Sequence, residues 1–99
     1  MAATGGTQKQ IAFRTMPMRD RQTGKWYDVD VVPGIGEVSK NKLAEEGFTN
    51  VSQLIGQFLL FNCDNELMDP WIKEKIPTLA SDKRTMIVTA LKEWTDNNL

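Results

Sequence analysis

The sequence contains no histidine and a single cysteine, Cys63. The missing histidine removes the commonest general base and the histidine-assisted serine and cysteine nucleophiles. A lone cysteine excludes an internal disulfide bond and a zinc site built from cysteines. These absences argue against an enzyme, and the sequence predicts neither a bound metal nor a cofactor.

Long apolar runs are also missing. No stretch approaches the roughly 18 apolar residues that a membrane span requires, and the opening residues, MAATGGTQKQ, lack the apolar core of a signal peptide. We therefore expect an intracellular protein that is not inserted into a membrane. The 99 residues suit one domain, and 40% apolar with 25% charged residues is typical of a soluble globular protein.

Charge is unevenly distributed along the chain, although the formal net charge is only −1. Residues 1–26 contain five basic side chains against one acidic side chain, whereas the remainder contains seven basic and twelve acidic ones. A basic segment on an acidic body suits binding to a phosphate backbone or to an acidic surface. A solvated basic tail without a ligand is the alternative interpretation.

The apolar pattern predicts an all-α fold, a compact bundle of about five short helices, because no segment alternates apolar and polar residues as a strand does. Residues 1–10 are small and polar and are expected to form a flexible arm. Residues 11–99 are expected to form a single helical domain. A first helix over residues 11–18 is limited by Pro17, and a short helix over residues 28–32 stops at the next proline.

Capping residues mark where the later helices begin and end. Gly47 is expected to end the helix that follows the glycine segment. Thr49 or Asn50 then caps the next helix, and Asp64 caps the one after it. Within that helix, Pro70 either produces a kink or starts a new helix.

A Ser81–Asp82 pair opens the last helix, whose apolar residues recur at helical spacing. The same periodicity places Val38 in one apolar stripe and Leu67 in another, so both are expected to be buried. In the alternative in which Pro70 restarts a helix, Asp69 is the capping residue.

The segment PGIGEV, residues 33–38, matches the hairpin of a helix-hairpin-helix motif, expected around residues 28–47. Gly34 and Gly36 are expected to adopt backbone angles that other residues resist and to leave room for a ligand, while Ile35 is buried and anchors the turn. The amides that begin the next helix would then bind a DNA phosphate, with no preference for base sequence. A plain helix-capping turn is the alternative.

The segment LIGQFLL, residues 54–60, is apolar on more than one face of its helix. Gly56 within it marks either a close approach of another backbone or a tolerated cost in helix stability. A monomer of this size cannot easily cover so much apolar surface, so the segment predicts a partner.

The segments GIGEV, KLAEEGF, LIGQFLL and LKEW, together with Trp71 and the N-terminal TQKQIAF, resemble the barrier-to-autointegration factor family. This family comprises small metazoan proteins that bridge DNA. The resemblance extends from Thr7 to Leu99, with an apparent insertion near Arg19–Trp26. It implies a SAM-like helical fold and a homodimer that binds double-stranded DNA without sequence preference, joins two duplexes, and acts in chromatin organisation and nuclear assembly.

Site residues are also implied by this resemblance. The implied DNA-binding residues are Gln8, Lys9, Gly34, Ile35, Gly36, Val38, Lys42, Ser81 and Arg84. The implied dimer contact comprises Gly56, Leu59, Leu60 and Trp71. The register of PTLASDKRTM leaves open whether Lys83 or Arg84 supplies the basic contact of the last helix.

The family's partners and regulation complete these expectations. The resemblance implies binding to LEM-domain proteins of the inner nuclear membrane, to lamin and to histones, and a nuclear location with a cytoplasmic pool. Phosphorylation of Thr4 or Thr7 would add a charge of about −2 and release DNA. Because PTLASDKRTM departs from the family pattern, a dimeric protein-interaction adaptor with weakened DNA binding is the alternative function.

Overall fold

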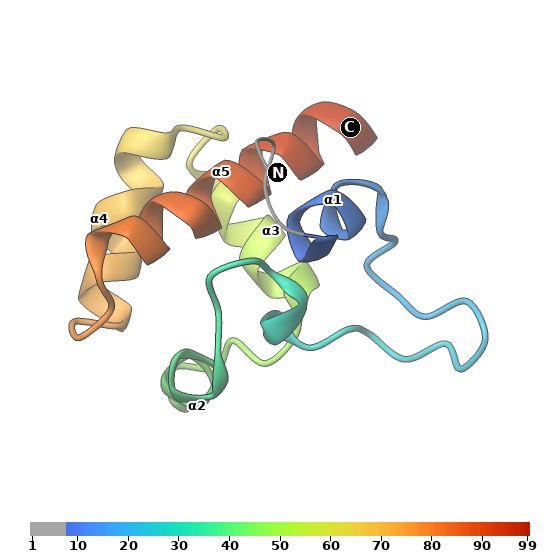
Figure 1. Cartoon of the computed structure of the whole chain (residues 1–99), viewed down its shortest axis with the longest axis horizontal. Helices are drawn as coiled ribbons and strands as arrows, with labels where there is room; N and C mark the ends of the chain where they lie inside the picture. The colour runs from blue at the N-terminus through green and yellow to red at the C-terminus, as the bar shows by residue number, and fades with distance from the viewer. Residues whose placement is uncertain (1–7) are drawn as a thin grey trace.

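A computed structural model describes residues 8–99 of the chain (Figure 1). These residues form five α-helices and one short 3-10 helix, and the described part of the chain contains no strand beyond two isolated bridges. The all-α prediction is therefore confirmed. The elements in chain order are α1 (Gln8–Thr15), η1 (Val29–Val31), α2 (Glu37–Glu45), α3 (Val51–Leu60), α4 (Asn65–Lys75) and α5 (Ser81–Asn98).

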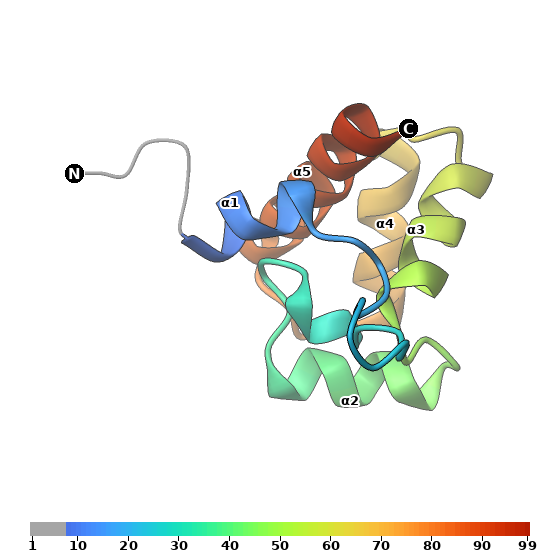
Figure 2. The same cartoon turned by 90° about the vertical axis from the view of Figure 1, so that its right-hand side faces the viewer.

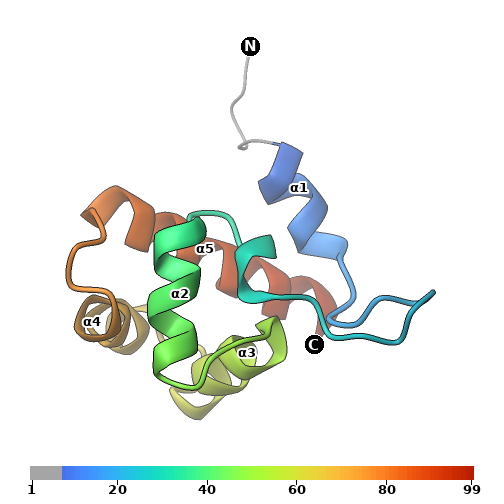
Figure 3. The same ribbon diagram turned by 90° about the horizontal axis from the view of Figure 1, so that it is seen from below.

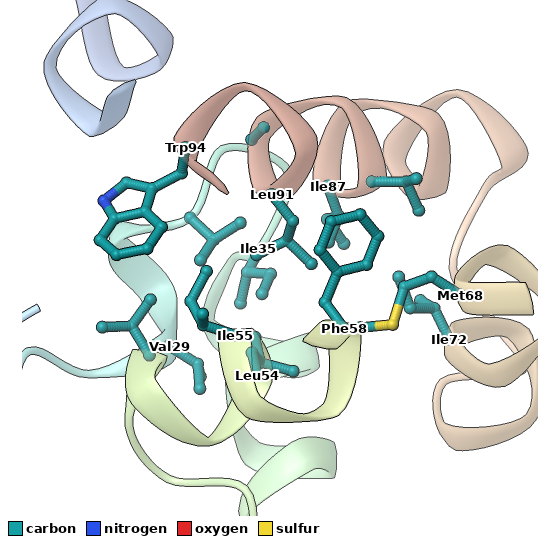
Figure 4. Close-up of a cluster of buried hydrophobic side chains, with 14 of the residues drawn as sticks. Val29, Ile35, Leu54, Ile55, Phe58, Met68, Ile72, Ile87, Leu91 and Trp94 are labelled. Carbon is teal, nitrogen blue, oxygen red and sulfur yellow. The ribbon is translucent and has the colours of Figure 1, made fainter. Parts of the chain in front are cut away.

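The longest helix, α5, crosses the whole molecule, and both α1 and α4 pack against it (Figure 1). The core lies between α5 and α3. Figure 4 shows Ile87, Leu91 and Trp94 of α5 facing Ile55 and Phe58 of α3, and all five are at most 5% exposed. Burying a large apolar side chain of this kind contributes about 1.5–3 kcal/mol, so this layer holds α3 and α5 together.

Helix α1 begins earlier and ends earlier than predicted from the sequence. It ends at Thr15, because Pro17 disfavours helical angles at the residue before it. Three hydrogen bonds tie its C-terminal end to α5: the Trp94 indole Nε1 donates to the Met16 carbonyl at 2.7 Å, and the side-chain amides of Asn97 and Asn98 donate to the Arg14 carbonyl at 3.1 and 2.8 Å. Residues 8–10 of the predicted arm thus belong to a docked helix.

Helices α3 and α4 are both capped by a side chain. The Asn50 side chain accepts from the Gln53 amide at 3.2 Å, and the Gln53 side chain accepts in return from the Asn50 amide at 3.1 Å. This reciprocal pair decides between the two predicted caps in favour of Asn50. The Asp64 carboxylate accepts from the Glu66 amide at 2.9 Å, which confirms the second predicted cap.

Helix α4 runs without a break through Pro70. A proline lacks an amide hydrogen, so one backbone bond is missing there, but the helix does not restart. The alternative in which Asp69 caps a new helix is therefore wrong. The Asp69 carboxylate instead accepts a hydrogen bond from Arg84 of α5 at 3.1 Å.

Two residues of the predicted apolar stripes lie at the surface. Val38 is 66% exposed and Leu67 is 50% exposed, contrary to the sequence-based expectation. Helical spacing alone does not give the width of the buried face, and both residues lie in the first turn of their helix, beyond the edge of the core. Gly47 does end α2 as predicted, with φ +89°.

Candidate nucleic-acid interface

A short turn, residues 33–36, connects η1 to α2, and we call it the glycine turn. The Ile35 amide donates to the Val32 carbonyl at 3.1 Å, which closes the turn. The Ile35 side chain is 2% exposed and points into the core (Figure 4). The prediction that Ile35 anchors the turn is confirmed.

Gly34 is held in a conformation and a space that only glycine suits. Its φ is +99°, in the region that L side chains rarely adopt. A Cβ atom there would lie 2.8 Å from Ile87 Cγ1 and 2.9 Å from the Lys83 carbonyl oxygen. The absence of a side chain at this position therefore lets the turn pack directly on α5.

Gly36 differs from Gly34 in both respects. Its φ is −102° and its ψ is −164°, an extended backbone that any residue adopts, so the prediction of an unusual φ is wrong for Gly36. A Cβ atom there would meet nothing within 4 Å in the described structure. The space above Gly36 is therefore open to a ligand.

Gly36 is also the N-cap of α2, and among the described residues no side chain caps this helix. The first intrahelical bond runs from the Lys40 amide to the Gly36 carbonyl at 2.9 Å. The amides of the first turn precede that bond and have no acceptor within the helix. Together with the positive end of the helix dipole, they favour an anion at this place.

Two lysines border these amides. A surface hollow of about 560 Å³, here called the anion groove, is formed by α1, the glycine turn, α2 and the start of α5. The Lys9 Nζ donates to the Ile35 carbonyl at 3.5 Å. This bond holds α1 over the glycine turn, and Figure 2 shows the helix lying above the turn. The groove is lined by Lys9, Pro33, Gly34, Ile35, Gly36, Glu37, Val38, Ser39, Leu79, Lys83 and Met86.

The last helix presents Lys83 to the groove, while Arg84 is engaged elsewhere. The Arg84 side chain bonds Asp69 at 3.1 Å and the Leu79 carbonyl at 3.3 Å. Neighbouring residues on a helix point about 100° apart, so only one of the two can face the groove. Sequence reasoning could not choose between them, because the carboxylate that holds Arg84 comes from another helix.

The remaining implied contacts lie on α2, α5 and α1. Lys42 is exposed on α2 and does not line the groove. Ser81 is exposed as the first residue of α5, whose N-cap, Ala80, provides no side-chain bond. Gln8 begins α1, whereas Thr4 and Thr7, the predicted phosphorylation sites, lie outside the described residues.

Lys40 joins the two elements that flank the glycine turn, a role that sequence reasoning missed. Its Nζ lies 3.3 Å from an Asp28 oxygen and 3.5 Å from an Asp30 oxygen. The hydrogen bond to Asp28 and the negative charges of Asp30 and Asp28 raise the pKa of Lys40. The Lys40 ammonium that forms these pairs therefore stays charged up to and above pH 10.5, the ordinary lysine pKa.

The predicted dimer residues occupy the outer side of α3 and the adjoining α4. Leu59 and Leu60 are 44% and 77% exposed, and a Cβ on Gly56 would meet nothing within 4 Å. Trp71 of α4 is half-buried and packs edge-to-face on Phe48 with ring centroids 5.0 Å apart. The α3 leucines thus form an unpartnered apolar face, whereas Trp71 also supports the core.

Other kinds of site find little support. Among residues 8–99, no group of three or more acidic, cysteine or histidine side chains is placed to hold a metal ion. No helix in this range combines the length and the apolar character that crossing a membrane requires.

Known proteins resemble this chain over most of its length. The family model described as barrier to autointegration factor matches residues 5–98. The chain is similar to the barrier-to-autointegration factor of Homo sapiens, with 33% identity over 90 residues that cover 91% of this chain and 93% of the relative. It is also similar to barrier-to-autointegration factor 1 of Caenorhabditis elegans, with 34% identity over 88 residues, or 89% and 91% of the two chains.

The two glycines are expected to respond differently to alanine. Gly34→Ala should lower the free energy of unfolding by about 2–4 kcal/mol, because it forces a positive φ on alanine and crowds α5. Gly36→Ala should change it by no more than about 1 kcal/mol, since the space is open and the backbone ordinary. Urea unfolding followed by circular dichroism measures both values. Equal losses for the two variants would contradict this assignment.

Proposed function

The chain belongs to the barrier-to-autointegration factor family, and we propose that it binds double-stranded DNA at the anion groove. The observation that carries the proposal is the uncapped start of α2 beneath an open Gly36. Lys9 and Lys83 flank it from two other helices. Three elements thus converge on a place where a phosphate would be stabilised.

A phosphate in the groove would accept hydrogen bonds from the amides of the first turn of α2. The helix dipole and the two lysines would neutralise its charge, against a single acidic groove residue, Glu37. These donors recognise phosphate oxygens and not base edges, so binding is expected to be independent of sequence. Backbone amides as donors also explain how a chain of net charge −1 can bind DNA.

We further propose that the protein is a homodimer joined through α3 and that it bridges two duplexes. Figures 2 and 3 place the glycine turn and α3 toward opposite sides of the molecule, with α2 running between them. A two-fold contact across α3 would therefore leave the two grooves facing outward in opposite directions. Such a dimer holds one duplex on each side.

This activity fits a non-enzymatic role in chromatin organisation and nuclear assembly, which we propose for the protein. Retention by DNA would concentrate the chain in the nucleus, with a cytoplasmic pool of unbound protein. Binding to LEM-domain proteins, lamin and histones remains a prediction from the family, as does release by phosphorylation of Thr4 or Thr7.

DNA binding is tested by Gly36→Asp. An aspartate at this N-cap would bond the free amides of α2 itself, which should raise the free energy of unfolding by about 0.5–1 kcal/mol. The same carboxylate would occupy the phosphate position and repel DNA, so affinity for a short blunt duplex should fall at least about tenfold, or 1.4 kcal/mol. Fluorescence anisotropy measures the affinity.

The matched control is Asn65→Asp. It adds the same charge at the first turn of α4, which is already capped by Asp64, and should change DNA affinity by less than about twofold at physiological salt. If Gly36→Asp binds DNA like the wild type, the groove is not the phosphate site. If the folded wild type does not bind DNA at all, the adaptor function takes its place.

Dimerisation is tested by Leu60→Asp. The substitution places a charge in the centre of the proposed apolar contact, whose desolvation would cost several kcal/mol. Light scattering should report twice 11.2 kDa for the wild type and 11.2 kDa for the variant. Leu99→Asp, at a position 74% exposed at the end of the chain, is the control and should remain dimeric.

The same variants are then tested for bridging, that is, for their ability to hold two DNA duplexes together. A biotinylated duplex should capture a second, fluorescent duplex in the presence of wild type or Leu99→Asp, but not of Leu60→Asp. A Leu60→Asp variant that stays dimeric would contradict the proposed contact.

A further inference from the structure

A hairpin that projects from the helical body has no role in the site described above. Residues 18–27, here called the basic hairpin, extend away from the helices (Figures 1 and 3). The Tyr27 amide donates to the Met18 carbonyl at 3.0 Å, and the Asp20 amide donates to the Lys25 carbonyl at 2.8 Å. These bonds give the projection a defined two-stranded shape.

The hairpin concentrates positive charge that the rest of the protein does not neutralise. Arg19, Arg21 and Lys25 are all exposed, and within residues 8–99 no carboxylate forms an ion pair with any of them. The one acidic residue, Asp20, is directed at the turn itself, where its oxygen accepts from the Gln22 amide at 2.8 Å. The cations are therefore available to an external anion.

One cation of the basic hairpin, Arg19, packs on an aromatic ring, that of Trp26. Trp26 is 50% exposed, and the Arg19 guanidinium carbon lies 5.3 Å from the centroid of its ring. The pair faces across the hairpin, which orders the guanidinium before any ligand arrives. The Trp26 ring thus contributes to the charged surface by holding the Arg19 guanidinium in place.

We propose that the basic hairpin is a second nucleic-acid contact, distinct from the anion groove, that binds the phosphate backbone. Guanidinium groups match phosphate oxygens in geometry and charge. The tip, residues 20–25, has the sequence DRQTGK, with no apolar side chain. Cores of protein–protein interfaces are apolar and depleted in charged residues, so this tip fits a nucleic-acid backbone better than an acidic protein.

The basic hairpin lies apart from the anion groove, and none of its residues lines the groove. Helix α1 carries Lys9 near its start, at the groove, and leads at its other end into the hairpin (Figure 3). Its eight residues span about 12 Å. The hairpin proposal concerns the same class of ligand as the proposed function but does not require the groove to be occupied.

The test is a salt series with the variant Arg21→Gln/Lys25→Gln, which leaves the Arg19–Trp26 pair intact. If each of the two side chains neutralises one phosphate, the slope of log affinity against log salt should become less steep by about 1.8. Affinity for a duplex longer than the groove footprint should fall at low salt. The control, Lys73→Gln/Lys92→Gln, changes the net charge equally at sites on α4 and α5 and should keep the wild-type slope.

Each result separates this proposal from the proposed function. An unchanged slope in the hairpin variant, with binding lost in Gly36→Asp, would overturn the hairpin contact and keep the groove. A slope that changes only in the hairpin variant, with Gly36→Asp binding DNA normally, would overturn the groove as the phosphate site and keep the hairpin contact. An equal loss in the lysine control would show a net-charge effect and overturn the proposal. Tighter binding of fluorescent polyglutamate than of a duplex with the same number of charges would also overturn it.

Discussion

Gly34 lies so close to α5 that a methyl group would not fit between them, with Ile87 Cγ1 and the Lys83 carbonyl both within 3 Å of the position of a Cβ. This contact fixes the glycine turn against the longest helix of the molecule. Because the turn is fixed, α2 starts at a defined place with its first amides exposed. The same contact brings Lys83 beside those amides, and Lys9 closes over the turn from α1.

The start of α2 shows a balance between stability and binding. Asn50 and Asp64 cap α3 and α4 with their side chains, whereas Gly36 leaves α2 uncapped. A side-chain cap contributes a few tenths of a kcal/mol more than glycine. The protein forgoes that small stabilisation, and the free amides are then available for an anion. The conformation of Gly36 requires no glycine. A side chain at this position would instead fill the open space in which we propose that a phosphate binds.

The sequence was sufficient for features set by local chemistry. The helical fold, the burial of Ile35, the Asp64 cap and the end of α2 at Gly47 all follow from periodicity and from the preferences of single residues. Features set by contacts between helices could not be predicted. Arg84 is drawn away from the groove by Asp69, a residue fifteen positions earlier, and no local pattern reveals that pair. Val38 is exposed because the core ends beside it.

Amide NMR would show at the level of single residues whether the first amides of α2 bind a DNA phosphate. A short duplex is titrated into the ¹⁵N-labelled protein, and the resonances of Gly36, Glu37 and Val38 are compared with those of Asn65 and Glu66 at the capped start of α4. We expect large, saturable chemical-shift changes for Gly36, Glu37 and Val38 and small ones for Asn65 and Glu66. Saturable DNA binding that leaves the Gly36–Val38 amides unmoved would contradict this expectation.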